Sequence, residues 1–296
     1  MRMLIALVTC ARLPRLTEDD RLLVAALRDL GVESCAAVWD DPSVDWPSFD
    51  AVILRSTWDY HLRIDEFLAW LDRLEACGAR VWNPVPVVRW NTNKGYLRDL
   101  DVPRVPTAFV PRGGDTGAAM REHGWQRAVV KPAVSATAFE THVVEHGEIA
   151  RRDVLVQPFI EEVVRDGEWS LLFFGGEYSH AVLKRAKPGD FRVQNDFGGT
   201  SEVRDPGAEV VAQASRMLAK VPSTLYARVD GVVIGGVFTL MELELIEPVL
   251  YLGMHAEAPE RLARAVFFAA AAASKGVKGT LSWHAEATAS PSAPPR

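Results

Sequence analysis

Two apolar runs in the last third of the chain constrain the fold more than any other stretch. Leu225–Ile234 and Val237–Leu245 are rich in aliphatic and β-branched side chains, and Gly235-Gly236 separates them. A two-glycine connection favours the tight turn of a β-hairpin. The sequence therefore predicts two adjacent antiparallel strands, and any fold of this chain must accommodate them.

The predicted hairpin contains three acidic residues within its apolar strands. Asp230 lies on the first strand, and Glu242 and Glu244 lie on the second, so their carboxylates can converge beside the sheet. Hard oxygen ligands suit Mg²⁺, which binds through one or two carboxylates together with substrate phosphates. For any one acid, a solvent-facing position is the simpler interpretation. The three together predict a metal site if phosphate-binding groups occur elsewhere in the chain.

Composition excludes several classes of function. The chain has 296 residues, 48% hydrophobic and 24% charged, which is typical of a globular protein with room for two domains. A net charge of −6 offers no basic surface for nucleic acid or an anionic membrane. No apolar run is long enough to cross a bilayer. The three cysteines show no metal-ligand spacing, which favours a reducing compartment, and we expect a cytoplasmic protein.

The first part of the chain alternates between strand and helix patterns. Strands are predicted at residues 3–9, 32–39, 51–55 and 80–82, and amphipathic helices at 17–30 and 64–76. This order predicts a small parallel α/β domain, and such sheets bind ligands at the carboxyl ends of their strands. The third strand ends in a polar and aromatic cluster that can hold a zwitterionic substrate: Arg55, Trp58, Asp59 and Tyr60. Alternatively, the aromatic residues simply cover the end of the sheet.

Phosphate-binding candidates follow in the middle of the chain. Lys94 begins a predicted short helix, Lys94–Leu100. Lys131 ends a predicted strand, and the next turn, Pro132–Ala138, consists of small residues that include Ser135. Backbone N–H groups of such a turn can approach phosphate oxygens closely. The two lysines and this turn therefore predict a site for a polyphosphate.

Nucleotide-binding candidates come next. The strand that ends in Gln157, Pro158, Phe159 and Ile160 offers backbone groups and an apolar wall suited to an adenine ring. Glu162 or Glu168 can accept hydrogen bonds from ribose hydroxyls, and we leave the choice open. Arg185 and Arg192 can bridge a γ-phosphate and a carboxylate. A second hairpin is predicted at 168–184 and helices at 207–220 and 259–273. The order of these groups along the chain indicates a site for ATP and magnesium.

These motifs resemble those of the ATP-grasp superfamily. The resemblance rests on Lys94 and on five segments, VVKP at 129–132, QPFI at 157–160, GDFR at 189–192, RVD at 228–230 and MELELIEP at 241–248. It covers nearly the whole chain and is closest to the glutathione synthetase-like and ribosomal-protein-modifying branches. It implies a mixed α/β (α+β) ATP-grasp fold. The implied domains are a pre-ATP-grasp parallel domain (1–88), a small lid subdomain (89–163), an antiparallel C-terminal subdomain with the metal site (164–286) and a disordered tail (287–296).

The resemblance also implies roles for the candidate residues. Lys94 and Lys131 would contact the phosphates, the 157–160 strand the adenine, and Glu168, with Glu162 as the alternative, the ribose. Asp230, Glu242 and Glu244 would hold two Mg²⁺ ions. Arg228, Arg192 and Lys131 would be catalytic, Arg228 by stabilising an oxyanion. The chain departs from many relatives in two places, since the 133–138 turn lacks glycine and Glu244 replaces asparagine.

Three further segments resemble the cycloserine-forming ligases, VTCARLP at 8–14, LRSTWDYH at 54–61 and ELELIEPVLYL at 242–252. This resemblance implies cyclisation of O-ureido-D-serine to D-cycloserine through an acylphosphate, with release of ADP and phosphate. His255 joins the four residues above as a substrate-binding candidate. One alternative is an intermolecular ligase that joins a carboxylate to an amine, and another is a non-catalytic ATP-binding regulator. We expect an amino-acid-like small-molecule substrate and no nucleic-acid or membrane partner; a homodimer is left open.

Overall fold

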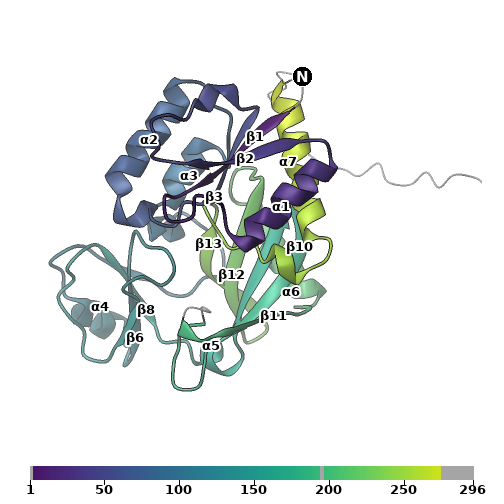
Figure 1. Cartoon of the computed structure of the whole chain (residues 1–296). Helices are drawn as coiled ribbons and strands as arrows, with labels where there is room; N and C mark the ends of the chain where they lie inside the picture. The colour runs from purple at the N-terminus through teal and green to yellow at the C-terminus, as the bar shows by residue number, and fades with distance from the viewer. Residues whose placement is uncertain (1–2, 194–196, 275–296) are drawn as a thin grey trace, which may run out of the picture.

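The computed structural model describes residues 3–193 and 197–274 and contains three β-sheets (Figure 1). The predicted mixed α/β (α+β) class is confirmed, since one parallel sheet and two antiparallel sheets combine with helices in these residues. The tail predicted at 287–296 lies outside the described residues, and the exact domain boundaries stay predictions.

The first sheet is parallel, with the order β2-β1-β3-β4. Its strands are β1 (Leu4–Thr9), β2 (Glu33–Val38), β3 (Ala51–Ser56) and β4 (Val81–Trp82), and its helices are α1 (Glu18–Asp29) and α2 (Ile64–Ala76). Alternate residues of a strand face opposite sides of a sheet. In β1, Ile5 and Leu7 face the helix α1, whereas Ala6 and Val8 face α2. Thr17 caps α1 by accepting a hydrogen bond from the Asp20 backbone N–H, at 3.0 Å.

The second sheet is antiparallel, with the order β5-β8-β6-β7. It consists of β5 (Ala108–Val110), β6 (Ala128–Pro132), β7 (His142–Val144) and β8 (Val154–Pro158). The helix α4 (Thr116–His123) packs on it through Met120, against Val130 and Val156. The sequence pattern does not predict α4, which is short and only weakly amphipathic. Its ends are nevertheless well marked, by Asp115 as the N-terminal cap and by Gly124 in the left-handed conformation.

The third sheet is also antiparallel, with the order β11-β10-β9-β12-β13. Its strands are β9 (Glu168–Phe174), β10 (Glu177–Arg185), β11 (Thr200–Val203), β12 (Tyr226–Ile234) and β13 (Val237–Glu244). The predicted hairpin is confirmed as β12 and β13, and Gly235 and Gly236 have φ angles of 57° and 84° in its turn. The predicted helices near the end of the chain are α6 (Ala208–Leu218) and α7 (Ala258–Ser274).

The first and third sheets share one hydrophobic core. Ile5 and Leu7 of β1 belong to the same buried cluster as Leu172 and Phe174 of β9, and Leu262 of α7 completes it. The helices α1 and α7 lie side by side over this cluster (Figure 1). These two sheets therefore form one packed unit, and the second sheet projects from it.

The connection between the first two sheets differs from the prediction. The helix α3 (Val85–Asn91) follows Pro84 and contains Pro86 in its first turn, where proline is tolerated. The helix predicted at 94–100 is the shorter 3₁₀ helix η3 (Lys94–Arg98). The remaining short helices are η1 (Trp46–Ser48), η2 (Tyr60–Leu62), α5 (Glu161–Arg165) and η5 (Leu252–Met254). No helix in residues 3–193 and 197–274 has the length and apolarity required to span a membrane.

Candidate active site

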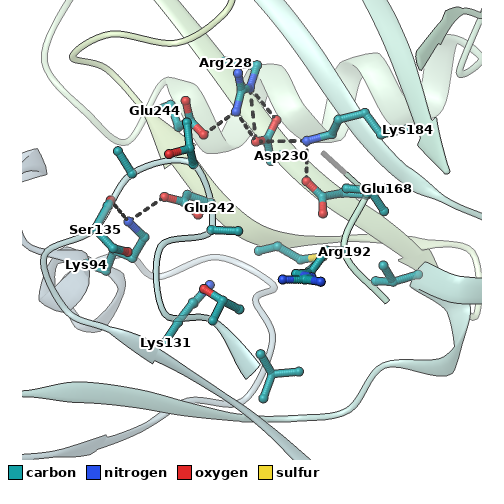
Figure 2. A pocket seen from close by; sticks show the side chains of 18 of the residues that line it. Lys94, Lys131, Ser135, Glu168, Lys184, Arg192, Arg228, Asp230, Glu242 and Glu244 are labelled. Carbon is teal, nitrogen blue, oxygen red and sulfur yellow. Dashed lines mark hydrogen bonds and ion pairs between the residues drawn. The ribbon is translucent and has the colours of Figure 1, made fainter. Parts of the chain in front are cut away.

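A cavity of about 370 Å³ lies where the three sheets meet. Trp58 and Tyr60 reach it from the first sheet, and Lys131 and Phe159 from the second. Most of its charged groups come from the third sheet (Figure 2). The lining includes five basic residues (Lys94, Lys131, Lys184, Arg192 and Arg228) and five acidic residues (Glu168, Asp230, Glu242, Glu244 and Glu247). Such an alternation of charge suits a phosphorylated ligand together with a cation.

Asp230 is the most constrained of the acids. It accepts hydrogen bonds from Ser170 Oγ at 2.6 Å and from Arg228 Nη2 at 2.9 Å, and Lys184 Nζ lies 3.4 Å away. Burial opposes its ionisation, but Arg228 and Lys184 outweigh burial and hold its pKa at about 2. The strand bulges directly after it, at Gly231, where an added Cβ would lie 2.6 Å from Thr239 O. Asp230 is therefore an ionised carboxylate in a fixed position.

Lys184 is a site residue that the sequence pattern does not reveal. It lies one residue before the end of β10, is 3% exposed, and donates to Glu168 Oε1 at 2.5 Å. Burial lowers the pKa of Lys184, but the charges of Asp230 and Glu168 more than compensate and raise it. The strand β10 is buried continuously from Ser179 to Lys184, so no alternation of exposed and buried residues singles out Lys184.

Lys94 connects the hairpin to the small-residue turn. Its Nζ lies 2.9 Å from Glu242 Oε1 and donates to the backbone carbonyl of Ser135 at 2.6 Å (Figure 2). In that turn Thr137 and Ala138 have φ angles of 49° and 53°. Left-handed backbone costs non-glycine residues on the order of 1–3 kcal/mol each. The turn thus adopts, without glycine, a conformation that glycine would favour, and it does so beside Lys94.

Glu244 and Glu247 have unusually high pKa values. Burial, opposed by Arg228, raises the pKa of Glu244 to about 7, and burial together with Glu244 raises that of Glu247 to about 8. Arg228 donates to Glu244 as well as to Asp230, so it is shared between two acids. Lys131 carries the opposite change, because burial lowers its pKa. A bound cation in this part of the cavity would therefore stabilise the ionised forms of Glu244 and Glu247.

The donor set fits Mg²⁺ rather than a metal held by protein alone. In the described residues no group of three or more His, Cys, Asp or Glu side chains forms a ready metal cage. Asp230, Glu242 and Glu244 instead line one cavity with lysines and an arginine between them. Mg²⁺ usually takes one or two carboxylates and completes its octahedron with phosphate oxygens and water. Residues that would hold it are the two or three acids of the hairpin.

The opposite end of the cavity is apolar. Phe159 lies over the Arg127 guanidinium, at 3.7 Å, and its ring centroid is 6.2 Å from that of Phe191. Pro158, Ile160 and Met241 line the same end. The side chain of Gln157 donates to Thr107 Oγ1 at 2.9 Å, so it fixes the strand position. This wall has the flat, apolar character that a nucleobase requires.

The structure brings most predicted residues together at the cavity and places others outside its lining. Trp58, Tyr60 and the phosphate, adenine and metal candidates Lys94, Lys131, Ser135, Gln157–Ile160, Glu168, Arg192, Arg228, Asp230, Glu242 and Glu244 line the cavity. Glu162 and Arg185 do not line it. Glu162 lies on α5 near Arg165, at 3.8 Å, and Arg185 lies near Glu202, at 3.8 Å.

Three predicted substrate contacts are also absent from the lining. Arg55 is 2% exposed, because its Nε donates to Asp20 Oδ1 at 2.9 Å and its Nη2 donates to Pro248 O at 2.9 Å. Asp59 accepts a hydrogen bond from Trp39 Nε1 at 2.9 Å. His255 stacks on His180, with ring centroids 5.4 Å apart. These side chains support the segments that carry the cavity residues and do not face the cavity.

The fold and this site together define an ATP-grasp ligase. Two solved structures share the fold. A RimK domain ATP-grasp protein from Sphaerobacter thermophilus matches with a TM-score of 0.63 and 19% identity, over 89% of this chain and 99% of that one. D-alanine–D-alanine ligase from Bacillus anthracis matches with a TM-score of 0.64 and 14% identity, over 93% of this chain and 99% of that one. ATP-grasp ligases use ATP and magnesium.

Proteins with higher sequence identity to this chain indicate which family of ATP-grasp ligases it belongs to. The model of the N-terminal domain of D-cycloserine synthetase DcsG matches residues 5–83. The cycloserine biosynthesis protein DcsG of Streptomyces lavendulae is 34% identical over 295 residues, which cover 89% of this chain and 97% of that protein. The crystal structure of D-cycloserine synthetase DcsG matches with a TM-score of 0.79 and 32% identity, over 90% of this chain and 99% of that one. The chain belongs to the D-cycloserine synthetase family of ATP-grasp ligases and is an ATP-dependent ligase.

Proposed function

We propose that the chain closes O-ureido-D-serine to D-cycloserine at the expense of ATP. The observation that carries the proposal is the extent of the similarity to the Streptomyces lavendulae protein, which spans nearly all of both chains. It therefore includes the first sheet, which contributes Trp58 and Tyr60 to the cavity, as well as the nucleotide-binding sheets.

The first step is phosphoryl transfer. A carboxylate oxygen of the substrate attacks the γ-phosphorus, the bond to the β–γ bridging oxygen breaks, and ADP leaves behind an acylphosphate. Catalysis of such a transfer requires mainly positioning and neutralisation of charge. Lys131, Lys184 and Arg192 line the cavity and supply that charge. Bound Mg²⁺ would add charge neutralisation at the phosphate oxygens, and we infer two ions for the three hairpin acids.

The second step forms the ring. The ureido nitrogen bonded to oxygen attacks the acyl carbon, gives up its proton, and phosphate leaves with the carbon–oxygen bonding pair. Donors aimed at the developing oxyanion lower this barrier. Arg228 is the donor that we assign, because its guanidinium is held in the cavity by Asp230 and by the carbonyl of Val249, at 3.2 Å. Both reacting ends belong to one molecule, which lowers the entropic cost of attack.

The complete reaction also consumes one water molecule. The ring nitrogen still carries the carbamoyl group after closure, whereas D-cycloserine has a free ring N–H. Hydrolysis of that carbon–nitrogen bond consumes one water molecule and yields carbon dioxide and ammonia. Release of ammonia, in a ratio of one to one with ADP, is therefore a signature of the complete reaction.

The test is ADP release by the purified chain with Mg²⁺ and ATP. The substrates are O-ureido-D-serine, its L-enantiomer, and amino acids with and without amines. We expect ADP only with the D-ureido compound, together with a cyclic product identified by mass. ADP release that requires both an amino acid and an amine would replace cyclisation with intermolecular ligation, and no ADP release from any substrate would contradict both.

A variant controls for contaminating ATPases. Glu242→Gln removes one predicted metal ligand whose side chain is 26% exposed, so the fold should tolerate it. Loss of ADP release in this variant assigns the activity to the cavity. The order of the rate in Mg²⁺ concentration then distinguishes one essential ion from two.

A further inference from the structure

Glu247 differs from the other acids that line the cavity. Glu168, Asp230, Glu242 and Glu244 are each paired with a lysine or an arginine within the cavity. The carboxylate of Glu247 has no hydrogen bond or ion pair with any residue in the described ranges. Only its backbone is held, since Trp58 Nε1 donates to Glu247 O at 3.1 Å. Glu247 is half-buried in the wall of the cavity, and its unpaired carboxyl group is available to a cationic ligand.

Tyr60 is the second group, and the charge of Glu247 acts on its hydroxyl. Its side chain is 3% exposed, lines the same cavity and packs on Phe67, with ring centroids 4.9 Å apart. Its hydroxyl makes no hydrogen bond with the part of the chain that the structure describes. Burial, and after it the charge of Glu247, raise the pKa of Tyr60 well above the usual range. The hydroxyl therefore stays protonated, and its oxygen lone pairs remain available as acceptors.

The position of Glu247 relative to Arg228 indicates which part of a ligand the carboxyl group meets. Arg228 Nη1 donates to Val249 O at 3.2 Å, so the segment 247–251 runs beside the guanidinium. In an α-amino acid the ammonium nitrogen is bonded to the carbon atom next to the carboxyl carbon. A substrate whose carboxyl group reacts beside Arg228 must place its ammonium group within a few ångströms, along this segment.

We propose that Glu247 and Tyr60 bind the α-ammonium group of the substrate. The inference rests on the proposed function insofar as the substrate is an amino acid whose carboxyl group lies at Arg228. An ammonium group beside Glu247 favours the ionised carboxylate, which supplies the opposite charge, and Tyr60 supplies a second acceptor, so together they select amino acids over simple carboxylic acids. A Glu247 that binds substrate also differs from a Glu247 that binds metal, because only the former senses the amino group.

The experiment compares O-ureido-D-serine with its des-amino counterpart, 3-(ureidooxy)propanoate. Calorimetric titration is performed on the full chain saturated with Mg²⁺ and a non-hydrolysable ATP analogue. Hydrogen bonds to charged groups are worth a factor of about 10 to 100 in affinity. We expect the wild-type chain to prefer the amino compound by about this factor. In Glu247→Gln the preference disappears, while affinity for the ATP analogue and for the des-amino compound is retained.

Two further variants sharpen the comparison. Tyr60→Phe, which removes only the hydroxyl, should reduce the preference about threefold to tenfold. Glu177→Gln, at an exposed position at the start of β10, is the matched control and should keep the full preference. Circular dichroism of each variant confirms that the fold is retained.

The inference is overturned if Glu247→Gln keeps the preference, or if wild-type protein binds neither compound. It is equally overturned if the variant loses affinity for both compounds and for Mg²⁺ in parallel, which would make Glu247 a metal ligand. The proposed function is judged separately, by the cyclic product. Cyclisation with an intact preference in Glu247→Gln would refute only the subsite, and a lost preference without any cyclic product would refute only the cyclisation.

Discussion

Replacement of Asp20 by asparagine tests whether Arg55 is a structural residue. Both side chains are buried, at 1% exposure for Arg55 and 2% for Asp20, and they form an ion pair at 2.9 Å. Arg55 Nη1 already lacks a hydrogen-bond partner among the residues that the structure describes. Asp20→Asn keeps the size of the side chain and removes its charge, so the guanidinium remains in the interior with less compensation.

The magnitude follows from the surroundings. Removal of one partner of a buried ion pair costs about 3–5 kcal/mol. Two features favour the lower end, since the asparagine oxygen can still accept from Arg55 Nε and the charge of Asp19 also acts on Arg55. We therefore expect a loss of about 3 kcal/mol in the free energy of unfolding. For a protein of this size the loss corresponds to a fall in Tm of about 6–12 °C.

Urea denaturation followed by circular dichroism measures the loss. Asp65→Asn, at an exposed position in the first turn of α2, is the matched control and should stay within about 0.5 kcal/mol of wild type. Asp20→Leu combined with Arg55→Met, which removes both charges, should recover most of the stability. An Asp20→Asn protein as stable as wild type but with a raised KM for substrate would refute the reasoning and return Arg55 to the substrate site.

Four other changes have defined outcomes. Glu242→Gln should lower kcat for ADP release about 100-fold or more while Tm stays constant, as a coupled ADP assay and a thermal melt would show. Lys131→Met should weaken ATP binding about 10- to 100-fold by calorimetry, without loss of stability, because burial already lowers the pKa of that lysine. Burial, and then His255, lower the pKa of His180 to about 4. Its stabilising contribution is full above pH 6.5 and is lost as the pH falls toward 4. Measured against His180→Phe, which keeps the opposing contributions of Glu244 and Glu247, the wild-type chain should therefore lose about 2 kcal/mol of stability to urea between pH 7 and pH 5. Gly231→Ala should destabilise the chain by about 1–3 kcal/mol in the same assay and reduce activity, because the new Cβ displaces the strand beside Asp230.

The sequence predicts the elements whose signals are local. The turn at Gly235-Gly236, the cap at Thr17 and the order of strands and helices in the first sheet all rest on neighbouring residues, and the structure confirms them. The helix α3 is missed because it is short and two prolines, Pro84 and Pro86, flank or occupy its first turn, although proline is compatible with that position.

Site residues are predictable where a motif marks them and not where packing decides. Lys131 and Asp230 stand out because a charge ends or interrupts an apolar strand. Arg55 looks equally suitable, but its partners Asp20 and Pro248 are distant in the sequence, and only the tertiary fold shows that they enclose it. Lys184 looks like an ordinary strand residue until β12 pairs with β9 and brings Asp230 beside it.

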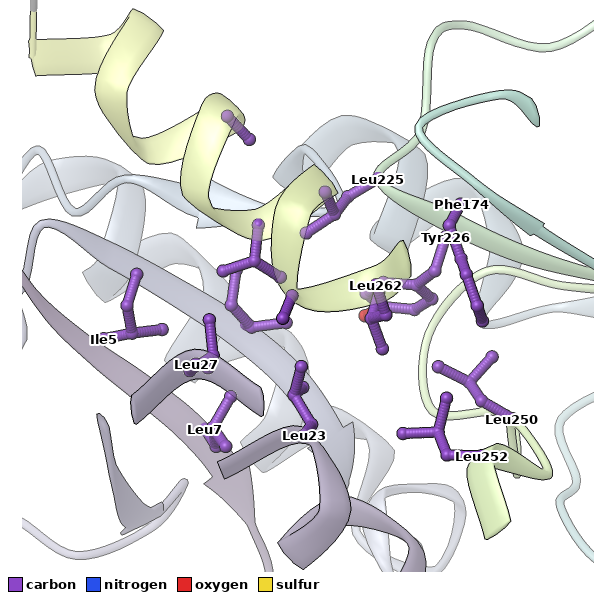
Figure 3. Close-up of a cluster of buried hydrophobic side chains, with 14 of the residues drawn as sticks. Ile5, Leu7, Leu23, Leu27, Phe174, Leu225, Tyr226, Leu250, Leu252 and Leu262 are labelled. Atoms are coloured by element: carbon purple, nitrogen blue, oxygen red, sulfur yellow. The ribbon is translucent and has the colours of Figure 1, made fainter. Parts of the chain in front are cut away.

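The core shared by the first and third sheets has a consequence for synthesis of the chain. Leu23 and Leu27 of α1 are buried together with Leu262 of α7 (Figure 3), and a ribosome adds residues at about 5–20 per second. The face that α7 covers therefore waits on the order of 10–50 s after α1 has been made. During that interval the nascent first sheet exposes to solvent the apolar side chains that α7 later covers. We expect production of this chain to depend on chaperone capacity and to improve at low expression temperature.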